Sequence, residues 1–300
     1  MVKSLTLVRS APENLTLSDA LESFVADAQA RRLTDKTVAY YRFELSRFVA
    51  FCDRTALAEI DGPLIRRYLT TLTKRGLKGS TVHAAARALR AWFRWCVRES
   101  LLSDDPMRNV QMPKVERPIL PALSVADVET LLAACESVRD RAIILCLLDS
   151  GCRAQEFVNL NIADVNKRTG EVTVRLGKGK KSRVTFFGPR SRKELMRYLY
   201  GRTVPDSAPL FVSDRGNHRL TVSGLAQILK RLGQVTGIHV SPHALRRTCA
   251  LWCHRKGWRL TEIQRLLGHS DLTVLLRYLD LDSEDVHEAF EKAPPSGMLG

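Results

Sequence analysis

The sequence predicts a mainly helical α+β protein of two domains, in which one β-hairpin interrupts a series of amphipathic helices. Most segments repeat their apolar residues at helical spacing. Strict alternation of apolar and polar residues is clear in only one stretch, near residues 172–187. A proline-rich interval divides the helical series, and 300 residues with 45% hydrophobic side chains suffice for two cores.

Four helices are expected in the first domain, residues 15–103, after a flexible tail at residues 1–14. The first helix opens at Thr16 and runs to about Ala30. The third begins at Asp61-Gly-Pro, because proline suits a first helical turn. The second and fourth share one apolar spacing, at Val38, Tyr41, Leu45, Phe48, Val49 and Cys52 and at Val82, Ala85, Leu89, Trp92, Phe93 and Cys96. Four such helices make a small bundle.

The chain is strongly basic, with a net charge of +15 and a pI near 9.8. Residues 1–120 hold 20 Lys+Arg against 13 Asp+Glu, so both parts of the chain contribute to the excess. Such a balance favours a polyanionic partner. On the fourth helix one face carries Arg87, Arg90, Arg94 and Arg98. This face is either an ordinary solvated surface or a surface that meets successive DNA phosphates.

A linker is expected at residues 104–122, because prolines there keep the chain extended. The second domain, residues 123–285, then starts with a helix capped by Ser124, and a more apolar helix follows over residues 139–149. Ser150-Gly151-Cys152 form a turn that leads to a helix opening at Arg153. Further helices are predicted over residues 190–200 and 220–236.

The predicted hairpin has a lysine-rich tip. Its strands alternate through Val172 and Val174 and return at Arg183, with Lys178, Lys180 and Lys181 in the turn between them. Lysine and glycine are common in soluble turns, which is the simpler interpretation. In so basic a chain the tip is also a candidate finger over a nucleic-acid backbone.

The stretch from Ser241 to Leu281 brings together several side chains suited to phosphate chemistry. His243 and Arg246 lie three residues apart on a predicted helix and so share a face. A second short helix is expected to start with a capping box at Thr261 and Gln264 and to end at Gly268. His269 follows at once, and Tyr278 comes nine residues later.

Other classes of protein find little support. The seven cysteines form no Cys-x-x-Cys pair and are expected to be reduced, and Cys249, Cys253 and His254 lack the second ligand pair that a zinc site needs. No segment is apolar enough for a signal peptide or a membrane span, so a cytoplasmic protein is expected. No Walker A or dinucleotide-binding glycine pattern is present.

Five motifs in order, SGCRAQE, LGKGKKSR, HALRR, LLGH and then the tyrosine, resemble those of the tyrosine recombinases, also called the phage integrase family, of the simple two-domain Xer-like type. The resemblance covers residues 15–285. It implies a SAM-like core-binding domain and a catalytic domain that together clamp DNA. It also implies a catalytic set of Arg153, Lys178, His243, Arg246, His269 and the nucleophile Tyr278, with Glu156 as support.

The resemblance implies a site-specific recombinase that joins DNA to Tyr278 through a 3′-phosphotyrosine and needs no metal, ATP or cofactor. Its partners would be double-stranded DNA and three further copies in a tetramer, with a second recombinase as an alternative. Residues 286–300 form a tail, and a short helix expected over residues 283–292 would dock on a neighbouring protomer or fray. Two other functions stay open: topoisomerase IB-like relaxation of DNA, and a catalytically silent architectural role.

Overall fold

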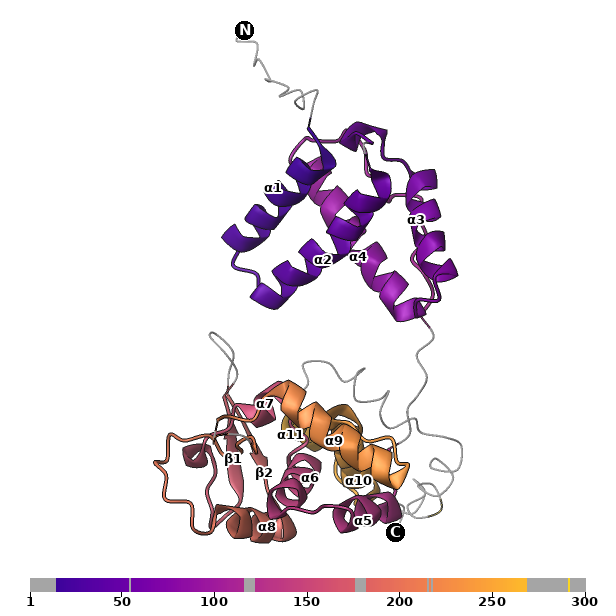
Figure 1. The fold of residues 1–300 in the computed structure, drawn as a ribbon. Coiled ribbons are helices and arrows are strands. Elements are labelled where there is room, and N and C mark those ends of the chain that lie inside the picture. The colour runs from indigo at the N-terminus through magenta and orange to yellow at the C-terminus, as the bar shows by residue number, and fades with distance from the viewer. Residues whose placement is uncertain are drawn as a thin grey trace, which may run out of the picture. The chain divides into compact units, whose positions relative to one another are not determined.

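The computed structural model divides the chain into two compact units, residues 1–118 and 119–300 (Figure 1). The structure describes residues 15–53, 55–115, 122–175, 182–214, 216, 218–268 and 291.

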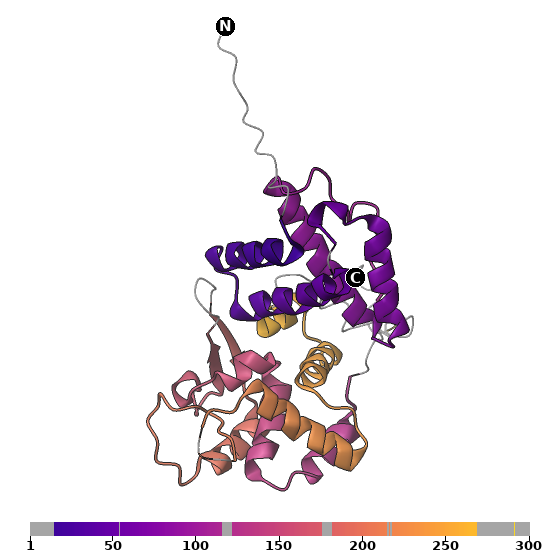
Figure 2. The same ribbon diagram turned by 45° about the horizontal axis from the view of Figure 1, so that its top comes forward.

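The first unit is a bundle of four helices. They are α1 (Leu17–Ala30), α2 (Asp35–Cys52), α3 (Gly62–Lys74) and α4 (Gly79–Arg98), with a 3₁₀ turn at Leu57–Glu59. Side-chain caps fix three of the starts, because Thr16, Thr34 and Asp61 each accept a hydrogen bond from a first-turn amide. Helix α4 contacts each of the other three helices, and Figure 2 shows the same bundle from a tilted direction.

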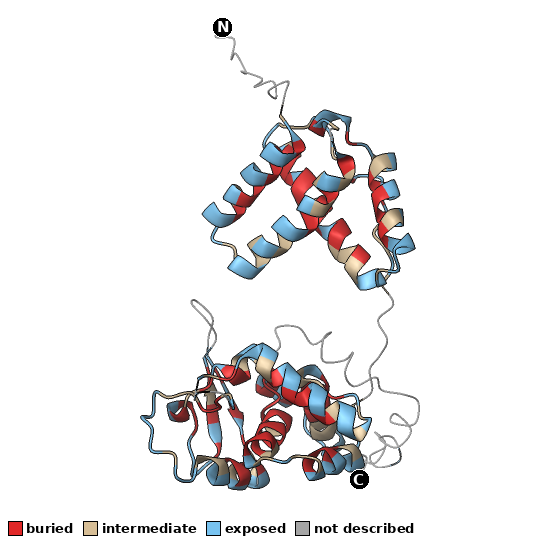
Figure 3. Cartoon of the chain, viewed as in Figure 1, coloured by how far each residue is buried: buried red, intermediate tan, exposed pale blue. Residues whose placement is uncertain are grey.

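Aromatic side chains fill the core of this bundle. Phe48 contacts Tyr68, Trp92 and Phe93 edge-on, and all four residues are buried. Figure 3 shows that buried and exposed positions alternate along the helices of this bundle. Part of the interval that was expected to be a linker also packs here. Met107 and Val110 are buried in the same core, since apolar side chains between the prolines can cover the end of the bundle.

The second unit is also mainly helical and holds the one small sheet. Its elements are α5 (Val125–Ala133), α6 (Val138–Ser150), α7 (Ala154–Val158), a 3₁₀ turn at Ile162–Asp164, β1 (Glu171–Val174), β2 (Arg183–Phe186), α8 (Pro189–Leu199), α9 (Val222–Thr236), α10 (Pro242–Arg255) and α11 (Leu260–Leu267). The predicted fold class, helical with a small antiparallel sheet, is thereby confirmed.

The buried helix α6 organises this unit, with α8, α10 and β2 packed around it (Figure 1). Every residue from Ala142 to Leu148 is buried, which explains why its sequence shows little amphipathic pattern. The strands pair antiparallel, with Val174 opposite Arg183. Their inward face therefore includes a buried guanidinium beside buried valines.

One predicted helix start is wrong. Residues Thr261 and Gln264 do not form the capping box of α11, because the helix begins at Leu260, two residues earlier than a cap at Thr261 would place it. The cap is Arg259, whose backbone N–H donates to a carboxylate oxygen of Glu262 at 2.9 Å. The predicted end is right, since Gly268 takes the left-handed conformation, φ +66°.

Candidate active site

Arg246 lies in the second turn of α10, the helix whose start is fixed by the hydroxyl of Ser241. Its side chain points inward, and the residue is only 3% exposed. One terminal nitrogen, Nη1, donates to the carbonyl of Gly151, and Nη2 donates to the carbonyl of Leu267 at 2.7 Å. These carbonyls end helices α6 and α11, where the helix dipole is negative and favours a cation.

Arg153 stands at the turn between α6 and α7. Its side chain is 48% exposed, and Nη1 donates to Oε1 of Glu156 at 2.7 Å. Its Nη2 donates to the carbonyl of Gly268 at 3.4 Å, so this arginine also meets the end of α11. Gly151 lets the turn form, because it ends α6 in the left-handed conformation.

Glu156 holds this turn together. Its Oε2 accepts the backbone N–H of Arg153 at 3.0 Å and a second guanidinium, that of Arg183, at 2.7 Å. Burial would raise the pKa of Glu156, but the Arg153 amide and the charge of Arg183 outweigh burial and lower it below its usual value. The carboxylate is therefore ionised at neutral pH and compensates two arginines.

Three consecutive carbonyls at the end of α11 each accept a hydrogen bond from a different arginine. Arg183 binds the carbonyl of Leu266, Arg246 that of Leu267, and Arg153 that of Gly268. We call Arg153, Arg183 and Arg246 the arginine cluster. It joins β2, α10 and the α6–α7 turn at the residue that precedes His269 in the chain.

His243 lies one turn before Arg246 on α10, where solvent reaches the residue and neighbouring atoms cover part of its ring. Partial burial and then the charges of Arg247 and Arg246 lower the pKa of its imidazole from the usual 6.5. The ring is consequently neutral at pH 7 and can accept a proton.

Models of protein families match most of the chain. Residues 121–285 match the phage integrase family, and residues 20–102 match the phage integrase N-terminal SAM-like domain. The chain belongs to the phage integrase family.

Known relatives agree. Tyrosine recombinase XerC of Psychromonas ingrahamii is 30% identical over 89% of this chain and 93% of its own length, and tyrosine recombinase XerD of Pseudomonas aeruginosa is 33% identical over 88% and 93%. A crystal structure of XerA recombinase matches 92% of this chain and 98% of its own, with 28% identity and a TM-score of 0.53. A lambda integrase (75-356) dimer bound to a COC′ core site shares the fold, with a TM-score of 0.77 at 17% identity over 89% of this chain and 96% of its own. The protein is thus a tyrosine-type site-specific DNA recombinase.

Several predicted site residues of this recombinase lie outside the described residues. They are Lys178, Lys180, Lys181, His269 and Tyr278. Of the predicted catalytic residues that the structure describes, Arg153 and Arg246 meet at the end of α11, and His243 shares a helix with Arg246. Sequence reasoning did not select Arg183 as a functional residue. A signal was present, since the register of the hairpin puts this charge on the apolar face.

The four arginines of α4 differ in their surroundings. Arg87 and Arg94 are exposed, and neither forms an ion pair with any other residue that the structure describes. Arg90 is half-buried and donates to the carbonyl of Val110 at 3.1 Å. Arg98 pairs with Asp27 at 3.6 Å and with Glu99 at 3.1 Å.

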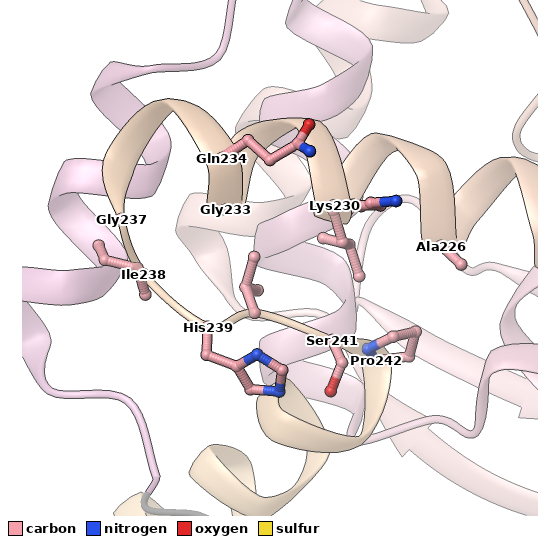
Figure 4. A pocket seen from close by; sticks show the side chains of 11 residues that line it. Ala226, Lys230, Gly233, Gln234, Gly237, Ile238, His239, Ser241 and Pro242 are labelled. Atoms are coloured by element: carbon pink, nitrogen blue, oxygen red, sulfur yellow. The ribbon is translucent and has the colours of Figure 1, made fainter. Parts of the chain in front are cut away.

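Figure 4 shows a pocket between the last turns of α9 and the segment that leads into α10, lined by Lys230, Gln234 and His239 among others. Of the predicted catalytic residues that the structure describes, Arg153, His243 and Arg246, none lines it. Within the described ranges, no three His, Cys, Asp or Glu side chains gather where they could hold a metal ion. All seven cysteines are free, five of them buried. None of the helices in the described part of the chain has the length and apolar character that a bilayer span requires.

Proposed function

We propose that this recombinase cuts and rejoins double-stranded DNA through a covalent bond to Tyr278. The phenolic oxygen attacks the phosphorus, and the 5′-oxygen of the next nucleotide leaves. The products are a 3′-phosphotyrosine and a free 5′-hydroxyl. A 5′-hydroxyl from another strand then reverses the step, and because each exchange replaces one phosphodiester by another, no ATP is needed.

Arg153 and Arg246 bind the non-bridging oxygens of the reacting phosphate. Guanidinium groups keep their charge at neutral pH and bind phosphate oxygens in pairs. Charge that grows on these oxygens in the transition state is stabilised by donors already in place. Arg246 is buried, and the carbonyls of Gly151 and Leu267 hold its guanidinium in a fixed position.

The proton transfers fall to other residues. Lys178 protonates the departing 5′-oxygen, as an ammonium group can. His243 accepts the proton of Tyr278, and its lowered pKa keeps it neutral for that task. His269 donates a hydrogen bond to the phosphate.

The observation that carries the proposal is the arrangement of the arginine cluster. Arg153 and Arg246 are distant in sequence, yet they donate to neighbouring carbonyls at the end of α11. Arg246 binds the carbonyl of Leu267, and Arg153 binds that of Gly268, the residue directly before His269. Two guanidinium groups so close together gather positive charge that favours an anion. We further propose that four copies act together on two DNA sites.

The test is a covalent adduct. A duplex that the protein binds, recovered by selection from genomic DNA, would be nicked close to the cleavage point so that the short released strand diffuses away. We expect a protein–DNA adduct on a denaturing gel in EDTA for the wild type and none for Tyr278→Phe. Tyr200→Phe is the matched control, since Tyr200 is a highly exposed tyrosine of the same unit.

Each outcome has a distinct meaning. Binding of the duplex without any adduct from the wild type would favour the architectural role. An adduct in Tyr278→Phe would show that another tyrosine is the nucleophile. Relaxation of supercoiled plasmid without exchange between two sites would favour the topoisomerase function.

A further inference from the structure

Arg183 is a charged residue in the core of the second unit. It is the first residue of β2, and its side chain is only 8% exposed. A buried guanidinium is costly unless its charge and its N–H groups find partners. The partners of Arg183 should therefore show what it does.

Two groups that also bind the other arginines of the cluster meet at this side chain: the carboxylate of Glu156 and the end of α11. Nη2 of Arg183 donates to Oε2 of Glu156 at 2.7 Å, and Nη1 donates to the carbonyl of Leu266. The other oxygen of the same carboxylate, Oε1, pairs with Arg153 at 2.7 Å. Through Glu156, the position of Arg153 is thus connected to that of Arg183.

The side chain of Arg183 fills the space beside Gly268 at the end of α11, so no side chain fits at that position. A β-carbon added to Gly268 would lie 2.3 Å from Cδ and 2.6 Å from Nε of Arg183, well inside van der Waals contact. The side chain of Arg183 therefore lies directly against the residue that precedes His269. Both terminal nitrogens of its guanidinium are held, one by Glu156 and the other by Leu266, so the side chain cannot easily move aside.

We infer that Arg183 is a positioning residue, which fixes Arg153 through Glu156 and fixes the α11 end that leads into His269. The inference rests on the proposed function, because it assigns Arg153 to the reacting phosphate. Arg183 itself need not touch DNA.

The geometry requires arginine rather than any cation. A guanidinium presents two terminal nitrogens in a rigid fork, so one can bind Glu156 while the other binds Leu266. A lysine carries a single ammonium group on a flexible stem. Arg183→Lys keeps the buried charge and most of the apolar stem, and it loses the fixed connection between the two partners.

The first experiment measures single-turnover cleavage of the nicked duplex at saturating protein. We expect Arg183→Lys to cleave roughly 30-fold more slowly than the wild type, less than the 100-fold or greater loss that removing a transition-state donor causes. Its affinity for the duplex should stay within about twofold. Arg183→Met, which also leaves Glu156 without one of its cations, should lose thermal stability in addition.

A neutral phosphate separates positioning from a general loss of structure. If a methyl group replaces one non-bridging oxygen, the phosphate loses the negative charge that Arg153 neutralises. On this methylphosphonate the deficit of Arg183→Lys should shrink to less than about fivefold, as that of Arg153→Ala should. A deficit that stays the same on both substrates would overturn the inference.

Arg219→Lys is the matched control. Arg219 likewise donates to backbone carbonyls in this unit, those of Val158 at 2.9 Å and Leu160 at 3.2 Å, but it contacts no residue of the arginine cluster. Its cleavage rate should stay within about twofold of the wild type on either substrate. An equal loss in both Lys variants would mean that the effect is not specific to Arg183.

A second measurement does not depend on catalysis. Amide hydrogen exchange at Leu266, Leu267 and Gly268 should be about tenfold faster in Arg183→Lys than in the wild type and unchanged in Arg219→Lys. Absence of cleavage by the wild type would count against the proposed function alone, and exchange would still test the connection. Unchanged exchange in folded Arg183→Lys would overturn the inference. If Arg183→Lys does not fold, Glu156→Gln applies the same tests from the partner side.

Discussion

His243 and its cationic neighbours on α10 set a pH dependence. Partial burial and the charges of Arg247 and Arg246 lower the pKa of the imidazole below 6.5, so the neutral form still predominates at pH 6.5. If neutral His243 accepts the proton of Tyr278, the rate of adduct formation should fall as the pH is lowered, with the midpoint of the decline below pH 6.5. Single-turnover cleavage across this pH range would measure the decline.

Removing the cation with the larger effect on His243 should shift this decline. Arg247→Met keeps an apolar stem and removes one charge, so the pKa of His243 should rise and the loss of activity should begin at higher pH. Arg255→Met, on the last turn of the same helix, is the control and should leave the profile unchanged. The same profile in all three proteins would show that His243 does not limit the reaction.

At the scale of residues, sequence reasoning reached some contacts of the site and missed others. Helical spacing was enough to put His243 and Arg246 on one helix and Arg153 at the start of another. The contact between Arg183 and Leu266 joins residues 83 positions apart, and no local pattern encodes it. A charge on the apolar face of a hairpin is a signal that could have raised the question.

The end of α11 should be sensitive to any side chain at Gly268. In Gly268→Ala the alanine would have to keep a left-handed backbone conformation, and its methyl group would overlap Arg183. We expect the free energy of unfolding to fall by about 2–4 kcal/mol, the sum of backbone strain and a displaced buried side chain. Chemical denaturation would measure it.

Gly257 is the control for strain alone. Its φ of +84° is also left-handed, but an added β-carbon would meet no atom within 4 Å. Gly257→Ala should therefore cost only about 1 kcal/mol. Equal losses at the two positions would show that the close approach of Arg183 adds nothing.

Helix α8 takes its cap from another helix. Its N-cap residue, Gly188, has no side chain to cap it, and Asp149 at the end of α6 accepts the Gly188 amide at 2.7 Å and the hydroxyl of Ser191. Asp149→Ala should lower the free energy of unfolding by about 1–3 kcal/mol, because it leaves these donors without a partner between packed helices. Denaturation curves would show the loss.

A local cap provides the comparison. Asp127 accepts the backbone N–H of Ser124 at 2.8 Å within the exposed first turn of α5. There water can replace the lost carboxylate, so Asp127→Ala should cost about 1 kcal/mol or less. A loss as large as that of Asp149→Ala would contradict the tertiary cap.

Elements were easier to predict than their ends. Periodicity found the long amphipathic helices, because one apolar face leaves a regular pattern. The starts of α8 and α11 depend instead on Asp149 and Glu262, and only the second of these lies in the same helix. The two 3₁₀ turns, at Leu57–Glu59 and Ile162–Asp164, are too short to show any period.

At the scale of the whole molecule, the two units have separate hydrophobic cores, and both parts of the sequence contribute to the excess of positive charge. Prolines in the sequence marked the interval between them. They did not reveal that Met107 and Val110 belong to the first core, since composition cannot say where an apolar side chain among prolines will pack. Net charge likewise predicts a polyanionic partner without identifying the residues that meet it.

Binding to DNA should depend on Arg87 and Arg94, the arginines of α4 whose side chains form no ion pair and no hydrogen bond with another described residue. Each cation that meets a phosphate releases counterions, so the logarithm of the affinity falls with the logarithm of salt concentration by about 0.9 per contact. The double variant Arg87→Ala, Arg94→Ala should weaken binding of a random-sequence duplex and reduce this slope by about 2. Arg98→Ala is the matched control on the same helix, because Arg98 already pairs with Asp27 and Glu99 and should change the slope less. An unchanged slope in the double variant would mean that this face of α4 is an ordinary solvated surface.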